Sequence, residues 1–175
     1  MKKQFISSIL IIFFNISFGQ TPFSIYKNKS FSMSYPAKWD TTNKDKRIIF
    51  MAVEKRKNDK DVFKENFTVY TVTLDKAMEM NIIVESAAAA FKQQGNTDKD
   101  IIEKGVKKTK KGLSYGLFKT KNITKDHTIV SSAIYFMKDK KVFVLTLSYD
   151  NIESVNYEKL YKSIIDTFEI NKNGL

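Results

Sequence analysis

The chain has 175 residues, a formal net charge of +11 at pH 7 and no cysteine. The lack of cysteine excludes disulfides, thiolate catalysis and lipid attachment through a cysteine. The excess of lysine favours acidic partners such as phospholipid or lipopolysaccharide head groups, acidic polysaccharide or acidic protein surfaces.

Residues 1–19 have the organisation of a secretory signal peptide. Two lysines form a positive head, and the apolar run over residues 5–18 is too short and too interrupted to span a membrane. Ser17 and Gly19 are small residues at the −3 and −1 positions of a cleavage site. We expect residues 20–175 to form one periplasmic or secreted domain, with no nucleic acid partner because the protein leaves the cytoplasm. An uncleaved N-terminal anchor is the alternative.

Four strands are predicted before the first helix. In FSMSY, residues 31–35, apolar side chains alternate with serine, as in a half-buried strand, and Pro36 ends the run. In ENFTVYTVTL, residues 65–74, both faces carry apolar side chains, which predicts helices above and below the sheet. Shorter strands are expected at residues 24–28 and 47–55.

The next segment, residues 82–94, has the pattern of an amphipathic helix. Its core-facing stripe consists of Ile83, Ala87 and Phe91, flanked by Val84 and Ala88. Asn81 is expected to be the N-cap and Gly95 the stop after the last turn.

The second half of the chain predicts four more strands and a closing helix. Residues 101–109 resemble a lysine-rich edge strand, residues 113–122 follow, and residues 127–139 and 140–149 form a hairpin that turns at Lys138 to Lys141. The helix covers residues 154–167, with Ser154 as N-cap and a stripe at three-four spacing: Tyr157, Leu160, Tyr161, Ile164 and Phe168. Because consecutive hairpins pair antiparallel, we predict an α+β fold, an α/β/α sandwich with a central, mainly antiparallel sheet and helices on its faces.

The order of these segments resembles the PsbP/Mog1-like superfamily, which includes the DcrB-type bacterial domains of unknown function. The similar features are a strand FSMS followed by YPAKW, the long strand NFTVYTVTL, the helix NIIVESAAAAFKQ, the strand KKVFVLTLSY and the closing SIIDTFEI. The resemblance extends from about Phe31 to Ile170. It implies the same α/β/α sandwich.

The resemblance implies no reaction. Relatives serve as photosystem assembly subunits, as a nuclear-transport GTPase cofactor and as chaperones for type VI secretion effectors, so most are binding or accessory proteins. The signal peptide separates this chain from the effector chaperones, which act in the cytoplasm. Some photosystem relatives bind metal ions, but this chain has no matching cluster of histidine and carboxylate, so we carry over no metal ligand and expect no cofactor.

Lysines gather in three clusters, at residues 54–61, 107–111 and 138–141. As solvated turns, they would keep sheet edges from pairing with other chains. The alternative is contact with an anionic envelope component or peripheral contact with a membrane, which requires the clusters to converge on one face. The candidate residues for such a contact are Lys107, Lys108, Lys110 and Lys111.

Trp39 is the only tryptophan and has two interpretations. As a core residue, it folds back over the end of the sheet and fills space. As a ligand shelf, it would line a pocket between sheet and helix together with Tyr35 and Tyr70. Large aromatic residues are more often buried in a core than exposed in a site, which favours the first interpretation.

The sequence offers no complete catalytic motif. His127 is the one histidine, and the one G-x-S-x-G match, GLSYG at residues 112–116, lies at the start of a predicted strand rather than at the strand-to-helix turn of a nucleophile elbow. The chain has no H-E-x-x-H, P-loop or G-x-G-x-x-G motif. We therefore expect that the protein is not an enzyme. We expect an exported binding or accessory protein of the bacterial envelope, whose partner is an unknown protein or an anionic envelope component. A small-ligand carrier with a pocket near Trp39 is the first alternative, and a hydrolase that uses His127 is the less favoured one.

Overall fold

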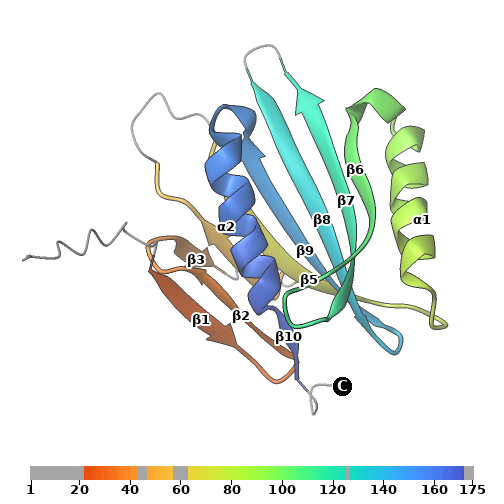
Figure 1. Cartoon of the computed structure of the whole chain (residues 1–175), viewed down its shortest axis with the longest axis horizontal. Coiled ribbons are helices and arrows are strands. Elements are labelled where there is room, and N and C mark those ends of the chain that lie inside the picture. Colours follow the sequence, from red (N-terminus) through yellow and green to blue (C-terminus); the bar gives the residue numbers. More distant parts are fainter. Residues whose placement is uncertain (1–21, 43–46, 57–62, 125–126, 172–175) are drawn as a thin grey trace, which may run out of the picture.

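The computed structural model describes residues 22–42, 47–56, 63–124 and 127–171, so the expected signal peptide lies outside the described residues. The described chain forms ten strands, two α-helices and two short 3-10 turns (Figure 1). In chain order these are β1 (Phe23–Lys27), β2 (Phe31–Pro36), β3 (Asp40–Thr42), β4 (Phe50–Val53), β5 (Asn66–Thr73), α1 (Met80–Gln93), η1 (Asp98–Asp100), β6 (Ile101–Lys108), β7 (Ser114–Ile123), β8 (Thr128–Lys138), β9 (Lys141–Asp150), η2 (Asn151–Glu153), α2 (Ser154–Thr167) and β10 (Glu169–Ile170).

The strands form two sheets, where the sequence predicted one. The large sheet has the order β3-β4-β5-β9-β8-β7-β6, and the small sheet has the order β1-β2-β10. Every pairing among the described strands is antiparallel. The predicted α+β class with a mainly antiparallel sheet is therefore confirmed, and β6 is the edge strand that its lysines indicated.

The two faces of the large sheet are covered differently. The small sheet and α2 lie on one face, where Phe31 of β2 packs against Phe143 of β9 with ring centroids 5.8 Å apart. Helix α1 lies on the other face and contacts mainly β6, β7 and β8. A Cβ at Gly116 of β7 would lie only 2.7 Å from Cγ2 of Val84, so this glycine lets α1 approach the sheet closely.

Because α1 lies over one half of the sheet, the expected helical cover on both sides of β5 does not hold. Phe67 and Val69 of β5 are fully buried under α2 and the small sheet, whereas Val72, on the other face, is 42% exposed. Tyr70 shares that face and lies beside Tyr135 across Val144 of β9. Burial raises the pKa of Tyr135 to about 12.

The ends of both helices differ in detail from the predictions. Helix α1 begins at Met80, so Glu79 is its N-cap and Asn81 already lies inside the helix. Gly95 follows the helix with φ of +87°, as expected for a residue that ends it. Ser154 is the first residue of α2 rather than its N-cap, because the chain enters the helix through η2, where the side chain of Asp150 accepts the cap hydrogen bond from the backbone N–H of Ile152.

The predicted stripe of α2 points into the core. Tyr157, Tyr161, Ile164 and Phe168 are buried, and Leu160 packs partly buried against them. The hydroxyl of Tyr161 donates to the backbone carbonyl of Ser148 in β9 at 2.6 Å, which satisfies the only polar group of a buried ring.

Trp39 lies in the same core, after the turn that follows Pro36. It is 7% exposed, and its ring centroid lies 5.9 Å from that of Phe67 and 6.5 Å from that of Tyr161. The side chain therefore fills the space between β5 and α2. This placement supports the interpretation of Trp39 as a core residue.

We predict that Trp39→Ala lowers the free energy of unfolding by about 3–5 kcal/mol, because it leaves a cavity between Phe67 and Tyr161. Equilibrium urea denaturation of the wild type and the variant measures the difference. Lys38→Ala changes the exposed neighbour and serves as control, with an expected change within about 0.5 kcal/mol. Equal stability of Trp39→Ala and the control would contradict the core assignment.

Candidate functional site

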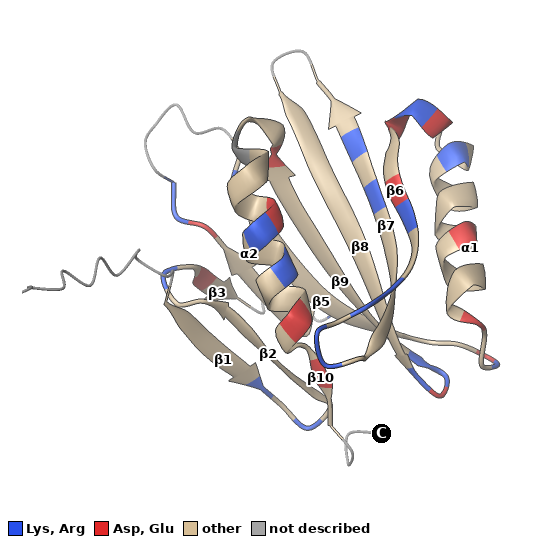
Figure 2. Cartoon of the chain, viewed as in Figure 1, with Lys and Arg blue, Asp and Glu red and all other residues tan. Residues whose placement is uncertain are grey.

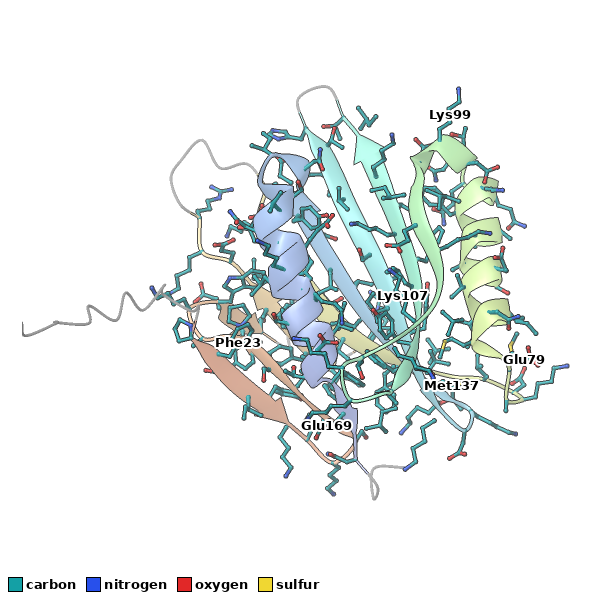
Figure 3. The ribbon with its side chains drawn as sticks, in the orientation of Figure 1. Phe23, Glu79, Lys99, Lys107, Met137 and Glu169 are labelled. Carbon is teal, nitrogen blue, oxygen red and sulfur yellow. The ribbon has the colours of Figure 1, made fainter. Side chains whose placement is uncertain are left out.

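A groove of about 260 Å³ lies between α2 and strands β6 to β9, on the face of the large sheet that α2 covers. Its floor is apolar and comes from three adjacent strands, with Leu117 from β7, Ile134 from β8 and Leu147 from β9. The groove exists because α2 packs on the β9 and β2 side and leaves the β6 and β7 side of this face uncovered (Figures 1 and 3).

Charged side chains along the groove form three ion pairs. Lys107 pairs with Glu103 on β6, Lys119 of β7 pairs with Glu158 of α2 at 2.6 Å, and Lys162 pairs with Asp166 on α2. Each lysine therefore has a carboxylate partner. The groove offers alternating charge rather than a positive field, although the whole chain is strongly basic.

Glu158 is the centre of the polar network that crosses the groove. Its Oε1 accepts a hydrogen bond from Lys119 Nζ at 2.6 Å and another from the Tyr149 hydroxyl at 3.0 Å. The hydrogen bond from Lys119 lowers the pKa of Glu158 and outweighs the opposite effect of burial. Burial and the neighbouring carboxylate raise the pKa of Tyr149, so its hydroxyl stays a donor at neutral pH.

Asp166 ties the turn between β6 and β7 to α2. Burial disfavours its charge, but hydrogen bonds from Lys162 and from the backbone N–H of Lys110 lower the pKa of this carboxyl below its ordinary value. The backbone N–H of Lys110 lies 3.0 Å from Oδ1, and the buried Oδ2 has no hydrogen-bond partner within the described part of the chain. The carboxylate thus fixes the position of the turn.

The four lysines expected to form one contact are divided by the fold. Lys107 lines the groove (Figure 3), and the alternation of side chains along β6 places Lys108 on the opposite face. Lys110 and Lys111 lie in the β6–β7 turn, where Lys111 pairs with Glu169. The cluster 107–111 is therefore not a single patch.

The three aromatic residues expected to share a pocket do not meet. Trp39 is in the core, and Tyr35 lines a separate hollow of about 270 Å³ with Tyr26, Ile49 and Phe50. Tyr70 lies on the other face of the large sheet from Trp39, because it alternates with Val69 along β5. The expected ligand pocket of Trp39, Tyr35 and Tyr70 therefore does not form.

His127 is paired with a carboxylate rather than with backbone alone. Its Nδ1 lies 2.6 Å from Oδ2 of Asp150, and both residues line an open hollow of about 360 Å³. Thr124 and Thr128 line the same hollow, and the Thr124 hydroxyl donates to the His127 carbonyl at 3.0 Å. A carboxylate that orients a histidine is part of a hydrolase site, but no serine is among the described residues that line this hollow.

Within residues 22–171, less the three internal gaps, no group of three or more histidine and carboxylate side chains has the arrangement of a metal site. Neither helix of the described chain has the length and apolarity needed to cross a bilayer.

Sequence reasoning missed the groove, apart from Lys107. The available signals were Lys119 directly after the apolar pair Leu117 and Phe118 of β7, and Glu158 and Lys162 four residues apart on the flank of the amphipathic helix α2. These positions show that one side of the helix is polar. They do not show which strand faces it.

Comparisons by sequence identify no family, since no family model and no curated protein match the chain. Comparison by structure does find neighbours. The cyanobacterial PsbP protein CyanoP from Synechocystis sp. PCC 6803 is 12% identical, with 88% of this chain and 95% of that chain covered and a TM-score of 0.61. LpqN, involved in cell envelope biogenesis of Mycobacterium tuberculosis, is 15% identical, with 86% of each chain covered and a TM-score of 0.53.

A protein from Bacteroides thetaiotaomicron VPI-5482 is 16% identical with a TM-score of 0.51; the match covers 83% of this chain and 46% of that chain. At these identities the likeness concerns the fold alone. The chain shares the fold of the PsbP protein CyanoP, in agreement with the fold that the resemblance of its sequence implied.

We predict that Glu158→Gln destabilises the protein at pH 7 and that this effect shrinks in acid. The lowered pKa of Glu158 means that its charge stabilises the fold above the ordinary value of 4.5, and this stabilisation is lost as the pH falls through the folded-state value. Urea denaturation at pH 7 and at pH 3 measures the difference between wild type and variant.

Glu85→Gln is the matched control, because Glu85 pairs with Lys104 on the α1 face without a tyrosine hydroxyl. We expect a smaller effect there at both pH values, as for an exposed ion pair. A difference for Glu158→Gln that is the same at pH 7 and pH 3 would show that its charge does not stabilise the fold.

Proposed function

We propose that this chain is an exported, non-catalytic binding or accessory protein of a bacterial envelope, and that its partner occupies the groove between α2 and β6. The groove carries this proposal, because an apolar floor with convergent polar groups at its rim is the usual form of a binding site. LpqN supports the assignment to the envelope, since this neighbour is involved in cell envelope biogenesis. Export rests on residues 1–19, and the DcrB-type assignment on the sequence resemblance.

The chemistry of the groove selects the kind of partner. Its lysines are already neutralised by Glu103, Glu158 and Asp166, so an anionic ligand gains little from them. An extended segment of a partner protein, with an apolar side chain over Leu117 and Ile134 and polar groups at the rim, matches both features. We therefore place a protein partner ahead of an anionic small molecule for this site.

A carrier of a small ligand is the second candidate, and the apolar floor of the groove favours it over the expected pocket at Trp39. The volume of about 260 Å³ is close to the lower end of ordinary ligand sites, which span roughly 300–1,000 Å³. Native mass spectrometry of the protein from its own host separates the two candidates. A mass above that of the chain supports the carrier, and a bare mass supports the protein partner.

A hydrolase that uses His127 is the third candidate. The contact between His127 and Asp150 supports this candidate, because a histidine that is bonded to a carboxylate can be oriented for catalysis. A nucleophile is still needed, and the Thr124 hydroxyl already bonds the His127 backbone. We therefore propose that the protein has no catalytic activity.

The proposed partner should be captured from the groove in living cells. A photo-reactive phenylalanine analogue in place of Lys107 is expected to form a protein adduct on irradiation, because this side chain lines the groove and is 41% exposed. The same analogue in place of Lys104 is the control. Lys104 lies on the same strand, is 38% exposed, and faces α1 through its pair with Glu85.

Adduct mass is read by gel and mass spectrometry. The proposal expects one defined adduct from position 107 and none from position 104. Equal adducts from both positions would mean that the groove has no special role, and no adduct at position 107 would remove it as the site of a protein partner.

A further inference from the structure

Four turns of the fold come together at one end of the molecule, although they are far apart in the sequence. The register of the large sheet places the β6–β7 turn beside the β8–β9 turn, because Gly116 pairs with Tyr135 and Lys138 with Lys141. The segment after β5 lies at the same end, since Thr73 pairs with Lys141. The β1–β2 turn completes this end, at the lower edge of the view in Figure 2.

Hydrogen bonds that involve β10 and Asn171 hold these turns together. Asn171 donates from its backbone to the Ser30 carbonyl at 2.9 Å and from its side chain to the Asn28 carbonyl at 2.7 Å. Lys138 donates to the Asn171 carbonyl at 3.4 Å. Glu169 pairs with Lys111 of the β6–β7 turn. The turns therefore keep fixed positions relative to one another.

We call this surface the basic end. It carries eight lysines, at positions 27, 29, 76, 110, 111, 138, 140 and 141, against four carboxylates, at positions 75, 79, 139 and 169. The rest of the described chain carries fourteen lysines and arginines against eleven aspartates and glutamates. More than half of the net positive charge of the described residues is thus concentrated on one end of the molecule (Figure 2).

The choice of lysine over arginine indicates whether the anionic partner is one defined group or a broad surface. Every described cation of the basic end is lysine, whereas the two arginines of the chain, Arg47 and Arg56, lie elsewhere. Arginine is the residue for bidentate recognition of a defined carboxylate or phosphate, whereas lysine is a hydrated point charge on a flexible stem. Lysines on separate turns therefore fit a broad anionic surface better than one bound group.

The shape of the basic end agrees with this conclusion. Its lysines lie in the turns or in the strand residues next to them, and none of them lines the three hollows described above. Each lysine near an anionic bilayer surface adds attraction without a fixed partner, within about one Debye length. A single anionic molecule would instead need a concave site with fixed donors.

We propose that the basic end is a docking surface for an anionic lipid bilayer, on which the protein stands with its strands directed away from the membrane. This inference rests on the proposed export to the envelope and is independent of the groove. It also gives a role to the lysine cluster 138–141 and to Lys110 and Lys111 of the cluster 107–111. Most of the third cluster, residues 57–61, lies outside the described residues.

The docked orientation has a consequence for the groove and for His127. The carboxyl end of α2 lies at the basic end, next to the turn that Asp166 holds, while η2 and the hollow of His127 lie at the opposite end of the strands. A docked molecule therefore presents the groove sideways and the His127 hollow away from the lipid.

The test uses the chain from Gln20, the mature form under the proposed export, and vesicles of phosphatidylcholine with or without phosphatidylglycerol. We expect sedimentation with the anionic vesicles alone, and a steep decrease between 50 and 200 mM salt. The triple variant Lys29→Glu, Lys110→Glu and Lys140→Glu changes one exposed lysine in each of three turns. We expect it to lower the partition coefficient about a hundredfold or more.

The matched control is the triple variant Lys38→Glu, Lys99→Glu and Lys159→Glu, which changes the net charge equally at exposed positions away from the basic end. Lys38 follows the end of β2 opposite the β1–β2 turn, Lys99 lies in η1 (Figure 3), and Lys159 lies in the half of α2 next to η2. A decrease of only a few-fold is expected for it. Thermal denaturation of both variants verifies folding, and the corresponding glutamine variants replace any that fails to fold.

Equal loss of binding in the two triple variants would overturn the proposal, since binding would then follow net charge alone. Wild-type protein that fails to sediment with anionic vesicles, or that binds a soluble acidic polysaccharide in preference to them, would also overturn it. These outcomes do not affect adduct formation at position 107, so failure of the docking surface and failure of the groove are distinguishable.

Discussion

The arrangement of the molecule depends on one buried aromatic contact, the packing of Phe168 between the two sheets. This ring stacks on Phe136 of the large sheet with centroids 4.2 Å apart and on Phe31 of the small sheet at 5.3 Å. It follows α2 directly and precedes β10, so it fixes where the helix ends and where the last strand begins. Each buried aromatic side chain contributes a large apolar area, and here the same ring joins three layers.

Two surfaces follow from this packing. Phe168 and the stripe of α2 hold the helix over β9 and β2, so the sheet extends beyond the helix and the floor of the groove stays accessible. The same ring places β10 against β2, and the residues around β10 bind the turns that carry the lysines. The groove and the basic end are thus separate surfaces, with different chemistry, that depend on one region of the core.

The sequence predicted local structure well where a repeating pattern was strong. The stripe of α2, the hairpin of β8 and β9 and the edge position of β6 were all visible, because each depends on residues close in the chain. The predictions were wrong where contacts between residues far apart in the sequence determine which side chains are buried. The two apolar faces of β5 predicted a helix on both sides, but Val72 is partly exposed and Tyr70 packs beside Tyr135 instead.

The candidate site was less visible than the fold. Lys119, Glu158 and Tyr149 are separated by up to 39 residues, and their hydrogen bonds form only after α2 packs across the sheet. Tyr35, Tyr70 and Trp39 resemble a ligand site in the sequence, but the alternation of side chains along β5 sends Tyr70 to the other face. Trp39 is buried because it packs against Phe67 and Tyr161, and the residues next to it in the sequence do not show these contacts.

By itself, the sequence determined the α+β class, most of the elements and the basic character, because periodicity and composition are local properties of a chain. Only the tertiary structure decided that the strands form two sheets, that the lysines of the groove are neutralised by carboxylates, and that separate turns converge on one basic end. The physical reason is that charge balance and concavity depend on distances between residues remote in sequence. Those distances are set by how α2 and the small sheet pack on the large one.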